Sequence, residues 1–266
     1  MVEQLYHNPD IYRIYVPLPD NPLKYLNCYV LVSDGETLII DTGFNRPECK
    51  QALFDGLDEL QVDFAHTKLF LTHLHGDHSG LTEELTARGV PVFMNAIDYD
   101  YLCQELASGG WQAMEQIFLS EGFPMEEIEK QKKGNQARLY SPHHPFPASK
   151  VSDNDLLTVG GITLRCIHTP GHTPGHTCLY IEDKEILFSG DHILFDITPN
   201  ISVWRNIPYS LADYLESLQK IKGLKVSHTK ETAENRYRAL CHSSDLFFYS
   251  RRFSDDDFCE HVTHYA

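Results

Sequence analysis

Three short apolar segments of this chain are each followed directly by a loop that carries histidine or aspartate. The segments are Lys68–Leu71, Ile162–Ile167 and Ile186–Phe188, and the loops after them read THLHGDHSG, HTPGHTPGHT and SGDH. A short apolar run bounded by glycine or proline is typical of a buried β-strand. The pattern therefore predicts polar loops at the ends of strands that are distant in the sequence, and we expect these loops to build one site.

The rest of the chain alternates between β-rich and helical patterns. The further expected strands are Ile11–Val16, Tyr25–Val32, Thr37–Asp41, Pro91–Met94, Leu156–Val159, His176–Ile181 and Leu224–Val226, and the expected helices are Pro47–Leu60, Leu81–Arg88 and Ser210–Ile221. Two β-rich halves, each followed by helices, indicate two mixed sheets packed face to face with helices outside. The predicted fold class is α/β, a four-layer αββα sandwich.

The stretch at about 96–133 has a different character, with long helical patterns, several acidic residues and a Gly109-Gly110 break. We interpret it as a helical insertion that covers the site. Its aromatic residues either wall a pocket or, as is more common, pack within the insertion; they include Tyr99, Tyr101, Trp111 and Phe118. Because no linker and no strong repeat is visible, residues 1–266 are predicted to form a single domain.

The charge balance narrows the range of partners. The 38 acidic residues outnumber the 22 basic ones, which gives a formal net charge of -16. Such a surface repels phosphate backbones and anionic membranes, so we expect neither nucleic acid nor a membrane as a partner. The 7 cysteines form no C-x-x-C pair, no apolar stretch is long enough to span a bilayer, and no signal peptide is visible. These features favour free thiols in a reducing compartment and a cytoplasmic location.

The segment Thr72–His78 concentrates three histidines and an aspartate within six positions. In an extended backbone the side chains of His73 and His75 lie on the same side. A turn into a helix near Gly76 lets Asp77 and His78 reach a neighbouring point. Imidazole and carboxylate ligands suit zinc and also accept manganese or iron. The spacing therefore predicts two adjacent metals.

Two later loops supply further ligand types. His172 lies in a loop after the strand Ile162–Ile167, and Asp191 follows the strand Ile186–Phe188. A carboxylate beside glycine at a strand end can bridge two cations and offset part of their charge. Gly-Asp-His by itself is weak support, but three such loops in series indicate a metal centre.

These motifs, in this order, resemble those of the metallo-β-lactamase superfamily. The resemblance rests on I-D-T-G, T-H-L-H-G-D-H-S-G, T-P-G-H-T-P-G-H-T and S-G-D-H, and it extends from about Val16 to Leu224. Within the superfamily the chain looks most similar to the glyoxalase II-like hydrolases.

The resemblance implies a role for each matching residue. It implies that His73, His75 and His172 hold the first metal, and that Asp77 and His78 hold the second. Asp191 would bridge both metals, and Asp41 would lie beneath the site and orient a ligand without touching metal. His176, which begins the next strand, is expected to be a supporting residue.

The C-terminal part departs from the family pattern. The family usually ends with a histidine after a late strand, which completes the shell of the second metal. Here His228 is the natural candidate and His242 the second, but neither lies in a Gly-His or Ala-His motif. The segment at about 229–266 is atypical for the family. If the second metal lacks its last ligand, we expect one metal to be bound tightly and the other weakly.

The predicted function is hydrolysis of a small ester or thioester by a water molecule that two metal ions have activated to hydroxide. Zinc is the expected metal, with iron or manganese as alternatives. Asp77 would orient the nucleophile and carry its proton. The expected substrate is a small molecule, and the sequence leaves a homo-oligomer open.

Four other functions share the motif set. They are a lactonase, an RNA phosphodiesterase, an iron-dependent persulfide dioxygenase and a non-catalytic metal-binding sensor. The acidic composition counts against RNA as the substrate.

Overall fold

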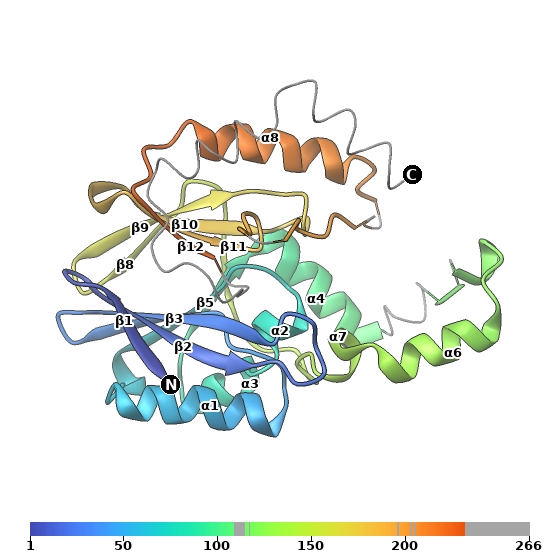
Figure 1. Cartoon of the computed structure of the whole chain (residues 1–266), viewed down its shortest axis with the longest axis horizontal. Coiled ribbons are helices and arrows are strands. Elements are labelled where there is room, and N and C mark those ends of the chain that lie inside the picture. The colour runs from blue at the N-terminus through green and yellow to red at the C-terminus, as the bar shows by residue number, and fades with distance from the viewer. Residues whose placement is uncertain (109–114, 117, 196, 203, 205, 232–266) are drawn as a thin grey trace.

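A computed structural model describes residues 1–108, 115–116, 118–195, 197–202, 204 and 206–231. Two β-sheets pack face to face, and helices cover their outer faces (Figure 1). The predicted αββα sandwich is thus confirmed.

The first sheet has seven strands in the order β1-β2-β3-β4-β5-β6-β7. Their bounds are β1 Val2–Tyr6, β2 Asp10–Pro17, β3 Tyr25–Ser33, β4 Glu36–Ile40, β5 Thr67–Leu71, β6 Val92–Asn95 and β7 Ser149–Val151. The first four strands pair antiparallel, while β4, β5, β6 and β7 run parallel. The parallel half therefore brings the carboxyl ends of β4 and β5 to the same edge.

The second sheet has five strands in the order β12-β11-β10-β9-β8. Their bounds are β8 Leu156–Val159, β9 Ile162–His168, β10 Thr177–Ile181, β11 Ile186–Gly190 and β12 His228–Glu231. The connection between β9 and β10 and the end of β11 carry the second and third histidine- or aspartate-bearing loops.

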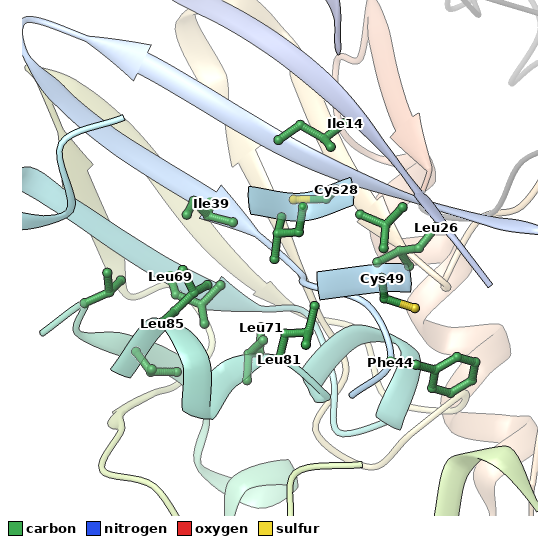
Figure 2. Packing of buried hydrophobic residues seen from close by; sticks show 14 of the residues in the cluster. Ile14, Leu26, Cys28, Ile39, Phe44, Cys49, Leu69, Leu71, Leu81 and Leu85 are labelled. Carbon is green, nitrogen blue, oxygen red and sulfur yellow. The ribbon is translucent and has the colours of Figure 1, made fainter. Parts of the chain in front are cut away.

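Helices complete the layers on both sides. Helix α1 (Pro47–Glu59) and the short helix α3 (Thr82–Thr86) lie against the first sheet, and α8 (Ser210–Lys222) covers the second sheet (Figure 1). Figure 2 shows side chains from the sheet, among them Ile39, Leu69 and Leu71, gathered with Leu81 and Leu85 from the helical layer. A second buried cluster fills the space between the sheets, and a third lies beneath α8.

The predicted insertion is helical where it is described. It contains α4 (Ala96–Ser108) and α6 (Met125–Gly134), and α7 (Gln136–Leu139) follows. Helix α4 packs on β6 and β7, whereas α6 extends away from the sandwich (Figure 1).

The four aromatic residues singled out in the insertion have different surroundings. The Tyr99 hydroxyl donates to the Phe146 carbonyl at 2.6 Å, and its ring lies against the core, as the more common interpretation expects. Tyr101 instead contacts Trp204 near the histidine loops. Phe118 is exposed and contacts Phe123, and Trp111 lies outside the described residues.

Some strand predictions are wrong. Leu224–Val226 forms no strand, and β12 begins only at His228. Strands β1 and β7 were not expected; β1 is only half-buried, and β7 has three residues, so both carry a weak apolar signal. Of the atypical C-terminal segment, residues 229–231 belong to β12, and the remainder lies outside the described residues.

No helix in the described part of the chain is long and apolar enough to cross a membrane.

We predict that Leu53→Ala lowers the free energy of unfolding by about 2–5 kcal/mol, because the Leu53 side chain is fully buried between α1 and the first sheet. Gln51→Ala on the exposed face of α1 is the control and should change it by less than about 0.5 kcal/mol. Urea titration of each variant measures both values, and equal effects would contradict the described packing.

Candidate metal centre

The site lies where the carboxyl ends of β5 and β11 meet the connection between β9 and β10. After β5 the chain runs through His73 and His75 and then turns into the short helix α2 (Gly76–Ser79), which carries Asp77 and His78. The β9–β10 connection carries His172, and Asp191 directly follows β11. Six of the predicted ligands are therefore brought to one place.

Three imidazoles form the first group of candidate ligands. His73 Nε2 lies 3.0 Å from His75 Nδ1, and His172 Nε2 also lies 3.0 Å from His75 Nδ1. Ligands held at 2.0–2.1 Å around a tetrahedral zinc are separated by about 3.3 Å, so these atoms need to move little to hold one ion. The three nitrogens all lie within 4.8 Å of one another, which is close enough for them to hold one metal ion.

The hydrogen-bond partners fix which ring nitrogen is free in two of these residues. His172 Nδ1 donates to the Asn200 carbonyl at 2.7 Å. His73 Nδ1 lies 3.0 Å from Thr72 Oγ1, whose own hydrogen is donated to Asp41. Both Nδ1 atoms therefore carry the proton, and the Nε2 lone pairs point into the trio.

The second group consists of His78, Asp77 and Asp191. His78 Nε2 lies 3.7 Å from Asp77 Oδ2 and 3.6 Å from Asp191 Oδ1. The other oxygen of Asp191 lies 3.5 Å from His172 Nε2 in the first group. The two oxygens of Asp191 thus face different groups, which is the arrangement of a bridging carboxylate.

Asp41 lies beneath both groups and is fully buried at a left-handed backbone angle, φ 61°. Its Oδ1 accepts from the Thr72 backbone N–H, and its Oδ2 accepts from the Thr72 hydroxyl and from His78 Nδ1. One carboxylate therefore orients a histidine of each group, as expected for a residue that supports ligands without joining them.

Burial and neighbouring charges shift the pKa values of the histidines in opposite directions in the two groups. Burial, followed by the surrounding histidines, holds the pKa of His73 and His75 well below the usual value. Burial would also lower the pKa of His78, but the carboxylates of Asp191, Asp41 and Asp77 together raise it well above normal. Burial raises the pKa of Asp77 as well. The first group therefore offers neutral imidazoles near pH 7, while His78 is protonated in the metal-free protein.

His176 supports the centre from below, consistent with its expected role. Its Nδ1 lies 2.8 Å from Thr169 Oγ1, and its ring is tilted against that of His73, with 5.3 Å between the centroids. A Cβ at Gly190 would lie 2.6 Å from His176 Nε2, and Gly190 has φ +52°. The glycine before Asp191 is thus required by a close approach.

Two residues near the centre were not singled out as site residues from the sequence. The Trp204 ring stacks on His75 at 6.0 Å, and its Nε1 donates to the His172 carbonyl at 3.2 Å. Asp98 hydrogen-bonds to Leu74 and Thr173, neighbours of the predicted ligands. Neither residue lies in a local motif; a carboxylate at the start of a helix is the only sequence signal that Asp98 offers.

The structure does not bring His228 to the cluster. His228 pairs with Ile186 at the start of β11, whereas Asp191 follows the end of that strand, and its ring contacts Tyr6. The cause is the strand boundary: His228 begins β12 instead of following a strand. His242 lies outside the described residues, and within those residues the further donor close to both His78 and Asp191 is His73.

The donor chemistry fits transition-metal ions. Uncharged imidazole nitrogens and carboxylate oxygens, already oriented by buried partners, are the ligand types that zinc, iron and manganese accept. The free cysteines among the described residues lie outside both groups of donor atoms, which excludes thiolate ligation by these cysteines in the two groups.

A family model of the metallo-beta-lactamase superfamily matches residues 22–227. The chain belongs to this superfamily. The resemblance that the sequence motifs indicated is therefore confirmed, and the matched residues include strands of both sheets and all six clustered residues.

Similar curated proteins include an atrochrysone carboxyl ACP thioesterase from Emericella nidulans, which is 28% identical over 83% of this chain and 53% of its own length. A lactamase-like protein, notP, from an Aspergillus species is 26% identical over 79% of this chain and 53% of its own. An uncharacterized protein from Aquifex aeolicus is 29% identical over 65% of this chain and 68% of its own. This chain thus spans about half the length of the fungal relatives.

Similar solved structures share the sandwich. A metallo-beta-lactamase family protein from Thermus thermophilus superposes with a TM-score of 0.75 at 29% identity, covering 91% of this chain and 79% of its own. A beta-lactamase domain protein from Burkholderia ambifaria has a TM-score of 0.71 at 22% identity, covering 94% of this chain and 76% of its own.

Metal analysis of three variants tests the ligand assignment. We predict that His172→Ala removes the tightly bound equivalent, because it deletes one of three converging nitrogens. Asp191→Ala should weaken both equivalents, since its two oxygens face both groups. His228→Ala is the control and should retain wild-type metal content; a loss there would place the missing ligand at His228 after all.

The two metal equivalents should differ in pH dependence. A metal at the second group displaces the proton of His78, whose pKa is raised, so its affinity should increase by about tenfold per pH unit while the pH stays below that pKa. The first group carries no such proton because the pKa values of His73 and His75 are lowered, so its affinity should change little between pH 7 and 8. Chelator competition at several pH values measures both, and equal slopes would contradict the assignment.

Proposed function

We propose that this protein is a metal-dependent hydrolase of thioesters and related small esters. The observation that carries the proposal is the close approach of two sets of donor side chains, His73, His75 and His172 in one and His73, His78 and Asp191 in the other, with Asp77 beside His78. Three imidazole nitrogens lie at one side of the Asp191 carboxylate, and His78 with Asp77 lies at the other. These donor atoms would hold two neighbouring cations.

The ligand roles follow from the free donor atoms. His73 Nε2, His75 Nδ1 and His172 Nε2 would hold the first ion, and Asp77 with His78 Nε2 would hold the second, with Asp191 between them. Zinc is the first choice for this donor set, with iron or manganese as alternatives. Bound there, the ions supply an activated water and polarise the carbonyl oxygen of the substrate.

The chain's own residues then hold the reactants and move the proton. Asp77 is partly buried, and this burial raises the pKa of its carboxyl, so it can both orient the attacking water and accept a proton from it. Asp41 keeps the His78 ring in the tautomer that faces the centre. The Trp204 ring, stacked on His75, would offer an apolar surface beside the centre for the acyl chain of a substrate.

Thioester cleavage is favoured among the hydrolytic reactions by the names of several curated relatives, which are ACP thioesterases. A thiolate is a good leaving group and needs no protonation, which suits a site whose histidines are occupied as ligands or ligand supports. The net charge of -16 disfavours RNA, whose backbone such a surface repels.

A substrate panel tests the proposal. The purified protein, loaded separately with zinc and with iron, is assayed with an acyl thioester, a lactone, a phosphodiester and a glutathione persulfide. We expect the zinc form to hydrolyse the thioester with the highest kcat/KM. A persulfide-dependent uptake of oxygen by the iron form, or no turnover of any substrate, would contradict the proposal in favour of a dioxygenase or a sensor.

Asp77→Asn tests the assigned proton acceptor. We expect kcat for the thioester to fall by about 10²–10⁴-fold, because the amide cannot take the proton of the attacking water. Asp100→Asn, a matched change of an exposed carboxylate paired with Lys150, is the control and should keep wild-type rates. An unchanged kcat in Asp77→Asn would remove Asp77 from the mechanism.

A further inference from the structure

Asp98 is a buried carboxylate at the start of α4 that the proposed mechanism does not use. Its side chain is fully buried. Burial and three hydrogen-bond donors determine its pKa, and no cationic side chain of the described residues is among these influences. A buried charge without a cationic partner is costly unless several dipoles stabilise it. Its hydrogen-bond partners therefore show what holds it in place.

The carboxylate of Asp98 accepts three hydrogen bonds from two loops. Oδ2 accepts from the Leu74 backbone N–H at 3.0 Å and from the Thr173 hydroxyl at 2.6 Å. Oδ1 accepts from the Gly175 backbone N–H at 2.5 Å. Leu74 belongs to the loop after β5 of the first sheet, whereas Thr173 and Gly175 belong to the loop between β9 and β10 of the second sheet.

These partners are immediate neighbours of the first group of ligands. Leu74 lies between His73 and His75, and Thr173 directly follows His172. The three imidazole nitrogens that converge within 3.0 Å come from these two loops. Asp98 therefore ties together the backbones that carry the two halves of the trio.

The contacts of Asp98 are not explained by its own helix. The N-terminus of α4 is capped by Asn95, whose Oδ1 accepts from the Ile97 N–H at 2.9 Å. The Asn95 side-chain amide also donates to Thr177 Oγ1 across to the second sheet. The N-terminus of α4 is thus capped without Asp98, and the Asp98 oxygens form hydrogen bonds with the two loops instead.

The close approach of α4 to the second loop requires a glycine. A Cβ at Gly175 would lie 2.7 Å from Asp98 Oδ1 and 2.5 Å from the Asp98 backbone nitrogen. Burial raises the pKa of Asp98 to about 6, and the hydrogen bonds from Thr173, Gly175 and Leu74 work against that rise. Both carboxylate oxygens accept from N–H or O–H donors, which is the contact pattern of the ionised form.

We propose that Asp98 is a positioning residue for the first metal group, a buried anionic clamp that sets the distance between the His73–His75 loop and the His172 loop. It touches neither metal nor substrate, and it acts through the backbones of Leu74 and Gly175 and the hydroxyl of Thr173. The inference rests on the proposed metal centre, and its test is separate from that of hydrolysis.

The test compares Asp98→Asn with Asp100→Asn. Asn has the shape of Asp but places an NH₂ donor against at least one of the three donors, so the loops lose a hydrogen bond and separate. Asp100, two positions along the same helix, is exposed and pairs with Lys150, so its variant controls for the loss of a negative charge.

Three quantities are measured: the Kd of the first zinc equivalent by chelator competition, the visible spectrum of the cobalt-substituted protein, and the unfolding midpoint of the metal-free protein. We expect Asp98→Asn to raise the Kd by about 10–100-fold and to shift the cobalt bands, as when a group that orients metal ligands is lost. Asp100→Asn should match the wild type in all three.

Thr173→Val provides a second, milder variant that keeps the carboxylate. It deletes one of the three donors, so it should raise the Kd in the same direction by a smaller factor. Because the Thr173 hydroxyl and the Asp98 carboxylate share one hydrogen bond, the double variant should raise the Kd by less than the product of the two single effects.

A lowered unfolding midpoint in Asp98→Asn, with wild-type Kd and cobalt spectrum, would overturn the proposal and leave Asp98 a purely structural residue. A wild-type protein that binds zinc as expected but cleaves no thioester would instead contradict the proposed function and leave the clamp standing.

Discussion

The structure depends on holding at least four histidines and three carboxylates together in a buried space at the edge where two sheets meet. Burial keeps the imidazoles of the first group uncharged, while the carboxylates around His78 keep it protonated when metal is absent. Bringing these ionisable side chains together in a buried space has a high desolvation cost, which the contacts between His78 and its three carboxylate neighbours offset in part. Cations held at the centre, as we propose, would add positive charge beside these carboxylates and offset a further part of that cost.

Two buried carboxylates organise this cluster from different directions. Asp41 acts from beneath, where it fixes the ring orientation of His78 directly and of His73 through Thr72. Asp98 acts from the side, where it joins loops of the two sheets. Both carboxylates accept several hydrogen bonds, including bonds from backbone N–H groups and threonine hydroxyls. Gly175 packs so closely against Asp98 that a side chain at this position would collide with it. The candidate ligands are thus held in place by a network of buried hydrogen bonds.

Much of the fold could be predicted from the sequence because its signals are local. The helix over Pro47–Glu59 has helical apolar spacing, and the short strands before the three loops are apolar runs bounded by turns. The ligand roles came from matching motifs, and the structure brings six of the seven residues together. The predicted position of His228 was wrong because it depends on where β12 begins and how it pairs with β11, and the sequence pattern predicted that strand at Leu224–Val226. Asp98 and Trp204 were missed for a related reason: their roles come from contacts with residues far away in the chain, which no local pattern reports.

The central claim is that His73, His75 and His172 bind one metal ion together. X-ray absorption at the zinc edge of the protein loaded with one equivalent measures this most directly. The account predicts a first shell of nitrogen and oxygen at about 2.0–2.1 Å, with the outer-shell scattering of three imidazole rings and no sulfur. A shell containing sulfur at about 2.3 Å, or a shell without imidazole scattering, would contradict it.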